Sequence, residues 1–190
     1  MSSIRGLVLM TRLEYLEATY GVEKYRAFLK RISTDEVNFS RQPVDGASTY
    51  PDTTLARIDQ VLLEDFFNGD VSPFKDIGIW SAGNFMFRFF NMYVENSQPM
   101  EFLSQYARLR KHLIGSGEMK VNILGNNQAE VSIDYGQTIP KSVCLSEQGF
   151  LEGGMVQCGA DEIQIKEHSC ASTADDYICE ITIRYKRRSK

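Results

Sequence analysis

The sequence predicts an α/β domain of the α+β kind, in which an antiparallel sheet of about four strands packs against helices. Apolar residues recur at helical spacing through most of the first 115 residues. After residue 116, two segments alternate between apolar and polar residues around a turn, and a further helical pattern separates them. The order helices, hairpin, helix, hairpin favours two hairpins in one sheet with the helices on one face. We expect a single domain over residues 1–190, with a mainly helical part over 1–115 and a hairpin–helix–hairpin part over 116–187.

The helical part divides into five segments. Thr11 is a candidate cap for the first helix, and Gly21 separates it from the second. The polar residues 33–50 contain Pro43 and Gly46 and predict a long loop. The segment over 72–96 is apolar nearly all round, so we expect it in the centre of the core or against a partner subunit. The five segments cover residues 11–20, 22–32, 51–67, 72–96 and 97–113.

The remaining residues predict the sheet. Met119 to Ile123 and Ala129 to Tyr135 alternate on either side of a turn at residues 125–127, as expected of a β-hairpin. Residues 139–160 return to helical spacing. The segments around Ile163 and Ile181 alternate again and predict the second hairpin.

Composition limits the function classes. The formal charge of −4 argues against a general nucleic-acid binder. No apolar run is long enough to span a membrane, and the N-terminus lacks a signal-peptide pattern, so we expect a cytoplasmic protein. No catalytic arrangement of residues stands out, and His112 is best interpreted as a surface residue near a helix C-terminus. Enzymatic activity therefore has no positive support.

The stretch KEHSCASTADDYIC, from Lys166 to Cys179, holds two of the four cysteines. In a reducing compartment these residues are more often thiols or metal ligands than disulfides. Strand parity puts His168 and Cys170 on one face, and it puts Cys179 with the apolar residues of the last strand. Metal ligands, buried thiols and a disulfide or redox pair all stay open from the residues alone. Cys158 belongs to no pattern and is expected in the core.

The segment VCLSEQGFLEGGMVQCGADEIQIKEHSCASTADDYICEITIRY resembles the 4-vinyl-reductase-type domain. It has a helix with G-x-x-x-G, a strand ending in E-x-x-C, a short turn and a strand that starts at a second cysteine. The N-terminal GLVLMTRLEYLEATYGVEKYRAFLKRI resembles an uncharacterised myxobacterial paralogous family of the same fold. The wider superfamily includes sensory domains of phenol-responsive activators and Bet3-type subunits of vesicle-tethering complexes.

This resemblance implies a Bet3/4-vinyl-reductase-like fold that dimerises through its helices. It also implies a zinc site formed by Cys144, Glu167, Cys170 and Cys179, with His168 as the alternative to Glu167 on the strand-parity argument. Zinc accepts thiolate, imidazole and carboxylate ligands in a tetrahedral site. The turn between Cys170 and Cys179 is one residue longer than in the family pattern, which could move Cys179 off its ligand position.

The sequence thus favours a non-catalytic domain that binds or senses a small apolar or aromatic ligand. The candidate pocket residues are Trp80, Phe85, Phe89 and Phe150, although the same residues are typical of a core or dimer interface. A homodimer that signals through a partner protein is expected. The alternatives are an interaction scaffold of the tethering-subunit type and a tetrapyrrole vinyl reductase or its accessory.

Overall fold

The structure is a computed structural model, and it describes residues 3–34, 38–89, 98–115, 117–173 and 175–188. The chain divides into two compact units. The first comprises residues 1–73 with 113–115, and the second comprises residues 74–112 with 116–190. None of the described helices is long and apolar enough to cross a membrane.

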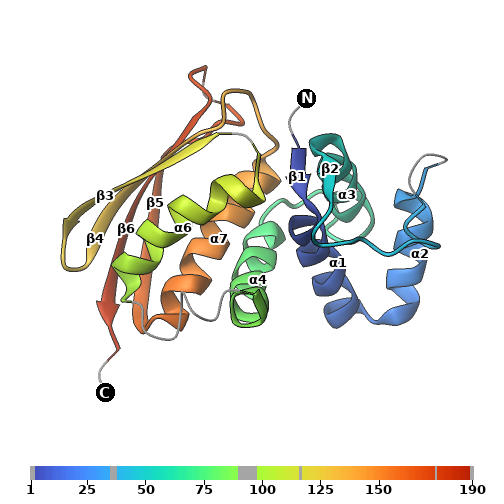
Figure 1. The fold of residues 1–190 in the computed structure, drawn as a ribbon, viewed down its shortest axis with the longest axis horizontal. Helices are drawn as coiled ribbons and strands as arrows, with labels where there is room; N and C mark the ends of the chain where they lie inside the picture. The colour runs from blue at the N-terminus through green and yellow to red at the C-terminus, as the bar shows by residue number, and fades with distance from the viewer. Residues whose placement is uncertain (1–2, 35–37, 90–97, 116, 174, 189–190) are drawn as a thin grey trace. The chain divides into compact units, whose positions relative to one another are not determined.

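The first unit is built on helices α1 (Gly6–Tyr20), α2 (Val22–Ile32) and α3 (Asp52–Asp65). Two short antiparallel strands, β1 (Ser3–Arg5) and β2 (Thr49–Pro51), pair beside them (Figure 1). Apolar side chains such as Leu16 and Ile58 are fully buried between the helices. A buried ion pair between Arg12 Nε and Asp59 Oδ1, at 3.1 Å, joins α1 to α3.

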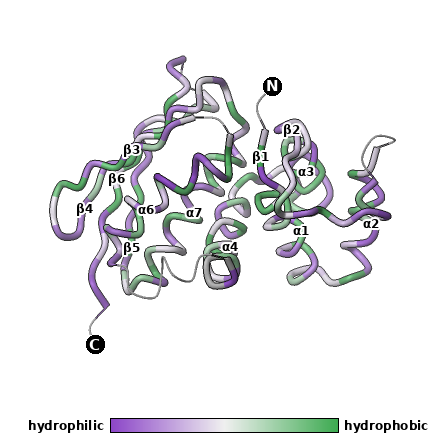
Figure 2. The backbone as a smooth tube through the Cα atoms, in the orientation of Figure 1, coloured by the Kyte–Doolittle hydropathy of each residue, from purple (hydrophilic) through white to green (hydrophobic). Residues whose placement is uncertain are grey.

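The second unit contains a four-stranded antiparallel sheet in the order β3–β4–β6–β5. The strands are β3 (Glu118–Gly125), β4 (Gln128–Asp134), β5 (Ala160–Ser169) and β6 (Ile178–Arg187). Hydrophobic and hydrophilic residues alternate along them in Figure 2, because one face lies on the core and the other meets solvent. Cys179 pairs with Ile133 across the β4–β6 ladder, so it belongs to the buried side.

Helices α4 (Pro73–Phe89), α6 (Pro99–Leu113) and α7 (Lys141–Gln157) complete this unit. In Figure 1, α6 and α7 lie along one face of the sheet. Helices α4 and α7 approach so closely that a Cβ added at Gly149 would overlap the carbonyl oxygen of Lys75, and one at Gly78 would overlap that of Ser146. Gly149 is therefore needed for helix contact rather than for flexibility.

The predicted α+β class and the antiparallel sheet of two hairpins packed on helices are confirmed. The predicted start of the first helix at Thr11 is wrong, since α1 begins at Gly6. The Thr11 hydroxyl donates to the carbonyl oxygen of Val8 inside the helix, so it does not cap the end. The predicted helix over 72–96 is observed as far as Phe89, and its last part lies outside the described residues. The pairing of β1 with β2 was missed, because three-residue strands carry no readable alternation.

Candidate functional site: a cluster of three thiols

Three cysteines from separate elements meet beneath the sheet. Cys144 lies in the first turn of α7, Cys170 directly follows β5, and Cys179 is the second residue of β6. Their Sγ atoms all lie within 4.8 Å of one another, and all three side chains are buried. We call Cys144, Cys170 and Cys179 the thiol cluster. Among the described residues no disulfide joins them, so each is a free thiol.

The hairpin turn after β5 positions two of these thiols. The Ser169 hydroxyl donates to the carbonyl oxygen of Ile178 and accepts from the amide of Glu180, which closes the end of the β5–β6 ladder. The amide of Ile139 donates to the carbonyl oxygen of Ala171 at 3.4 Å and ties the segment before α7 to this turn. The start of α7 is thereby held over the turn, and Cys144 reaches the other two sulfur atoms.

Hydrogen bonds join the three thiols to one another and to the backbone. The Cys170 thiol donates to Cys144 Sγ at 2.7 Å, and Cys144 Sγ lies 3.0 Å from Cys179 Sγ. The backbone amide of Ala171 donates to Cys179 Sγ at 3.2 Å. Either thiol can be the donor across this contact while both are protonated, and Cys144 is the donor once Cys179 is deprotonated, because a thiolate only accepts.

This arrangement separates the acidities of the thiols. The hydrogen bond from Cys144, supported by the amide of Ala171, lowers the pKa of Cys179 to about 7, although burial opposes the shift. The pKa of Cys144 is raised, because its hydrogen bond to Cys179 and its burial favour the protonated form. Cys179 is consequently the more acidic of these two thiols, and Cys144 is the less acidic one.

The fourth residue expected beside the cysteines does not join them. Glu167 accepts from Lys141 Nζ at 2.6 Å and from Gln148 Nε2 at 2.5 Å, which engages both of its oxygens with α7. His168 is exposed, and its Nε2 lies 2.8 Å from the Thr182 hydroxyl. The strand-parity argument for His168 fails because the register of β5 against β6 shifts between Glu167 and Ser169.

A buried charged network lies next to the cluster and was missed in the sequence. Glu147 follows Cys144 by three residues on α7, so both can share one helix face. Its Oε1 accepts from Arg110 Nε and from the Tyr106 hydroxyl, each at 2.9 Å. Its Oε2 accepts from the Tyr135 hydroxyl at 3.1 Å. The only sequence signal was a glutamate on the buried face of a helix, which is too common to interpret by itself.

The electrostatics of this network keep Arg110 and Tyr135 protonated. Burial alone would lower the pKa of the Arg110 guanidinium, but the charge of Glu147 outweighs it and the pKa is raised. Burial and the same carboxylate raise the pKa of Tyr135 well above its ordinary value. Tyr135 therefore keeps its proton, and Arg110 keeps its charge beside Glu147.

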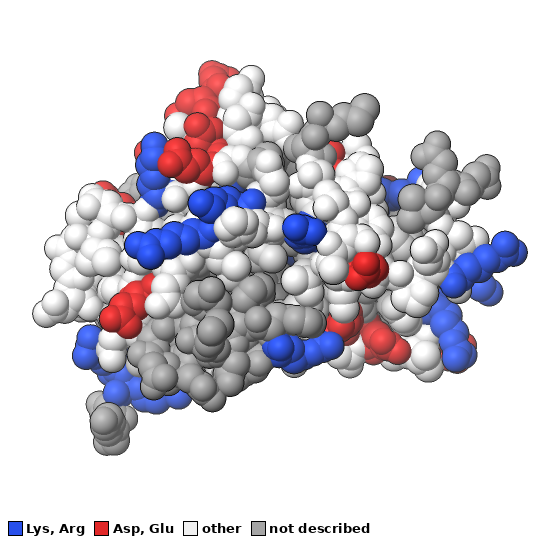
Figure 3. Space-filling model, in the orientation of Figure 1, with Lys and Arg blue, Asp and Glu red and all other residues white. Residues whose placement is uncertain are grey.

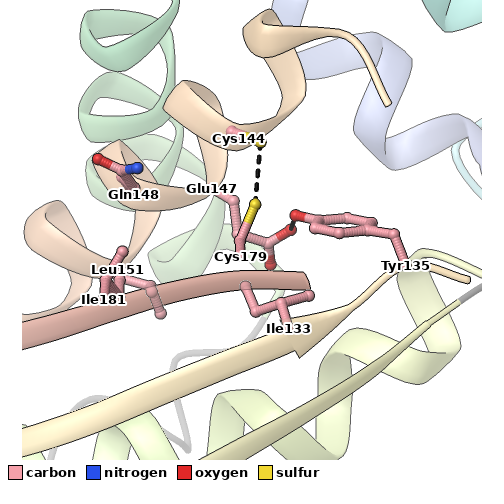
Figure 4. A pocket seen from close by; sticks show the side chains of 8 residues that line it. All are labelled: Ile133, Tyr135, Cys144, Glu147, Gln148, Leu151, Cys179 and Ile181. Carbon is pink, nitrogen blue, oxygen red and sulfur yellow. Dashed lines mark hydrogen bonds between the residues drawn. The ribbon is translucent and has the colours of Figure 1, made fainter. Parts of the chain in front are cut away.

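A cavity of about 10 Å³ separates the thiols from this network (Figure 4). Its volume is about that of one water molecule. Its lining comes from α7, β4 and β6 and from Tyr135 just beyond β4: Ile133, Tyr135, Cys144, Glu147, Gln148, Leu151, Cys179 and Ile181.

The aromatic residues expected to form a ligand pocket lie elsewhere. Phe85 is buried in α4, and Trp80 is half-buried on the same helix. Phe150 packs on Tyr106 with their ring centroids 4.8 Å apart. None of these three lines the cavity beside the thiols, and the side chain of Phe89 lies outside the described part of the chain.

Comparisons with known proteins identify the fold. No family model matches the chain. No curated protein matches it either. Among solved structures, an H-NOX protein from S. oneidensis in the Fe(II)NO ligation state is 16% identical, with a TM-score of 0.77 over 97% of this chain and 100% of that chain. The chain has the H-NOX fold.

Two further solved structures agree. An oxygen-binding H-NOX domain related to soluble guanylate cyclases is 14% identical, with a TM-score of 0.76 over 97% of this chain and 96% of that chain. A third structure, which probes the function of heme distortion in the H-NOX family, is also 14% identical, with a TM-score of 0.75 over 98% of this chain and 96% of that chain. Identities this low establish the architecture and leave the function to be argued from the site.

These matches correct two expectations. The resemblance to the 4-vinyl-reductase and Bet3-type superfamily is wrong, because the structures similar over the whole chain are H-NOX domains. The resemblance rested on short motifs around the cysteines, and such motifs do not fix a fold by themselves. Zinc as the cofactor is also wrong by this comparison, since the similar proteins are described with iron and heme.

The fold raises the question of whether the residues around the thiol cluster fit a heme. Histidine, cysteine, methionine and tyrosine are the usual axial ligands. Both histidines of this chain, His112 and His168, are exposed. Tyr135 is engaged with Glu147, and Cys144 and Cys179 border a cavity of about 10 Å³. Cofactor pockets are on the order of 300–1,000 Å³. The described residues at this site therefore do not fit a heme.

Proposed function

We propose that the chain is a non-catalytic sensor domain for a small oxidising molecule, and that its responsive element is the thiol cluster. The observation that carries this proposal is the placement of three buried free thiols within 4.8 Å of one another. The H-NOX fold supports a sensing role, since one solved relative is described as an oxygen-binding domain related to soluble guanylate cyclases.

The chemistry needs an external two-electron oxidant, for which a peroxide is sufficient. The Cys179 thiolate attacks one peroxide oxygen, the S–O bond forms, and the O–O bond breaks. The leaving hydroxide takes the Cys144 proton and becomes water. The Cys144 thiolate then attacks the Cys179 sulfur, the disulfide forms, and hydroxide leaves and takes a proton from solvent. One peroxide is reduced to two waters while two thiols are oxidised.

Disulfide formation would change how α7 is tied to the sheet. The three thiols come from the start of α7, the end of β5 and the start of β6, so a bond between Cys144 and Cys179 crosslinks helix and sheet. Helix α7 also contacts α4 closely at Gly149, which offers a rigid connection to a second helix. The output would pass to a partner protein, and dimerisation through the helices stays a prediction.

The other functions considered have less support. The tethering scaffold and the tetrapyrrole reductase both followed from the family resemblance that the H-NOX matches overturn. The cavity of about 10 Å³ between α7 and the sheet has no room for an aromatic ligand, and Trp80, Phe85 and Phe150 do not line it. We therefore place the response in the thiols themselves.

The experiment is intact mass spectrometry of the reduced protein before and after one equivalent of hydrogen peroxide. We expect a mass lower by about 2 Da, restored by dithiothreitol, in the wild type and in the matched control Cys158→Ser. Cys179→Ser should abolish the shift, because the proposed chemistry begins at Cys179, whereas Cys158 is half-buried and lies outside the cluster. An unchanged mass would contradict the proposal. So would one equivalent of a tightly held metal that disappears in Cys170→Ser.

A further inference from the structure

The cavity next to the thiol cluster has two different ends. Cys144, Cys179, Tyr135 and Glu147 give it polar atoms, whereas Ile133, Leu151 and Ile181 form its apolar wall (Figure 4). Cys170 is not among its lining residues. Two of the three thiols therefore face this space, and they are the pair linked at 3.0 Å.

The polar end can orient a small hydroxylated molecule. Glu147 is held by Arg110, Tyr106 and Tyr135, so its carboxylate is fixed in place. A carboxylate in this position accepts a hydrogen bond from an O–H group, and the Tyr135 oxygen lies beside it. Cys144, on the opposite side, carries the proton that a leaving hydroxide needs. The cavity thus presents an acceptor, a nucleophile and a proton donor to one small guest.

The size of the cavity restricts the guest. A volume of about 10 Å³ admits water and, with slight adjustment of the apolar wall, hydrogen peroxide. Peroxides with an aromatic or branched substituent would require Leu151 or Ile181 to move, and both side chains are almost completely buried. The burial of Cys179, with a relative exposure of 5%, likewise denies access to larger oxidants.

We propose that this cavity is the binding site at which hydrogen peroxide meets Cys179, with Glu147 and Tyr135 as positioning residues. The inference rests on the proposed function of the thiol cluster and adds the oxidant and the residues that orient it. Glu147 and Tyr135 act by placing the peroxide. The bonds that form and break are those of Cys179, Cys144 and the peroxide.

The test compares Tyr135→Phe with the matched control Tyr106→Phe. Both hydroxyls donate to Glu147 and both rings are buried, but only Tyr135 lines the cavity. We expect the second-order rate constant of oxidation by hydrogen peroxide to fall about fivefold in Tyr135→Phe, the effect of one lost hydrogen bond, and to change less than about twofold in Tyr106→Phe. The free energy of unfolding should fall by a similar amount in both variants, because each loses one hydrogen bond to Glu147.

Equal effects of the two substitutions on the rate of oxidation by hydrogen peroxide would overturn the inference. A second measurement needs no variant: the wild type should react with cumene hydroperoxide at least about fivefold more slowly than with hydrogen peroxide, since overlap with a packed core costs about 1 kcal/mol or more. Equal rates would also overturn it. These outcomes overturn only the binding site for hydrogen peroxide, because the disulfide still forms in each of them. A wild-type protein that forms no disulfide at all would refute the proposed function.

Discussion

Arg110 Nε lies 2.9 Å from Oε1 of Glu147, and the two side chains are only 1% and 3% exposed. The same carboxylate also accepts hydrogen bonds from the hydroxyls of Tyr106 and Tyr135, so these two buried hydroxyls need Glu147 as their acceptor. Removing one partner leaves the other charge buried without compensation, which typically costs more than the pair contributes.

We therefore expect Glu147→Ala to lower the free energy of unfolding by about 3–5 kcal/mol, measured by urea denaturation. The control is Glu152→Ala on the same helix, whose ion pair with Lys75 is partly exposed and should contribute about 0–1 kcal/mol. A similar cost for both variants would contradict the structural role assigned to the buried pair.

The α4–α7 contact predicts opposite results for two glycines. Gly149→Ala should lower the free energy of unfolding by about 1–3 kcal/mol or more, because the added methyl group overlaps the backbone of Lys75. Gly83→Ala places its Cβ 3.7 Å from Gln157 Nε2, and it should be neutral or stabilise α4 by about 1 kcal/mol through helix propensity. Thermal and urea unfolding of both variants measure the difference. Equal tolerance of the two substitutions would show that the helices do not approach at Gly149.

The reactivity of Cys179 should depend on pH near neutrality. The hydrogen bond from Cys144 lowers the pKa of Cys179 to about 7, so the thiolate fraction rises as the pH passes through that value. We expect the rate at which hydrogen peroxide forms a sulfenic acid, trapped with dimedone in a Cys158→Ser background, to rise through this range and then level off. In Cys144→Ala the donor is lost, and the midpoint should move upward. Identical midpoints in both proteins would contradict the assigned hydrogen bond.

Titration with hemin tests the poor fit of a heme to this site. We expect any hemin that binds to give the same spectrum in the wild type, Tyr135→Phe and Cys179→Ser, because the cavity beside these residues is about 10 Å³ and has no room for a porphyrin. A stoichiometric complex whose spectrum changes in Tyr135→Phe or Cys179→Ser would contradict this account of the site.

The sequence allowed the sheet to be predicted closely, and the physical reason is local. Alternation around Ile123 and Ile181, with turn residues between the runs, depends only on neighbours along the chain. Contacts between residues far apart in the sequence could not be predicted from such local patterns. The contact between Cys144 and Cys179 depends on the path of the chain from β4 into α7, which no local pattern predicts. Only the family resemblance suggested this contact, although the family itself was wrong.

The surface charges agree with the composition, but the composition did not predict the buried network around Glu147. On the face drawn in Figure 3, acidic and basic side chains are interspersed, as a formal charge of −4 among 190 residues would suggest. Arg110 reads as part of a basic helix end in the sequence, yet it is 1% exposed. Its burial depends on Glu147, which lies 37 residues away, and no local pattern connects the two.

Peptide mapping of the peroxide-treated protein under non-reducing conditions tests the central claim most directly. We predict a disulfide-linked pair that joins the peptide of Cys144 to that of Cys179, while Cys158 stays alkylatable. A disulfide that involves Cys158, or a fully reduced thiol cluster after complete consumption of the peroxide, would contradict it.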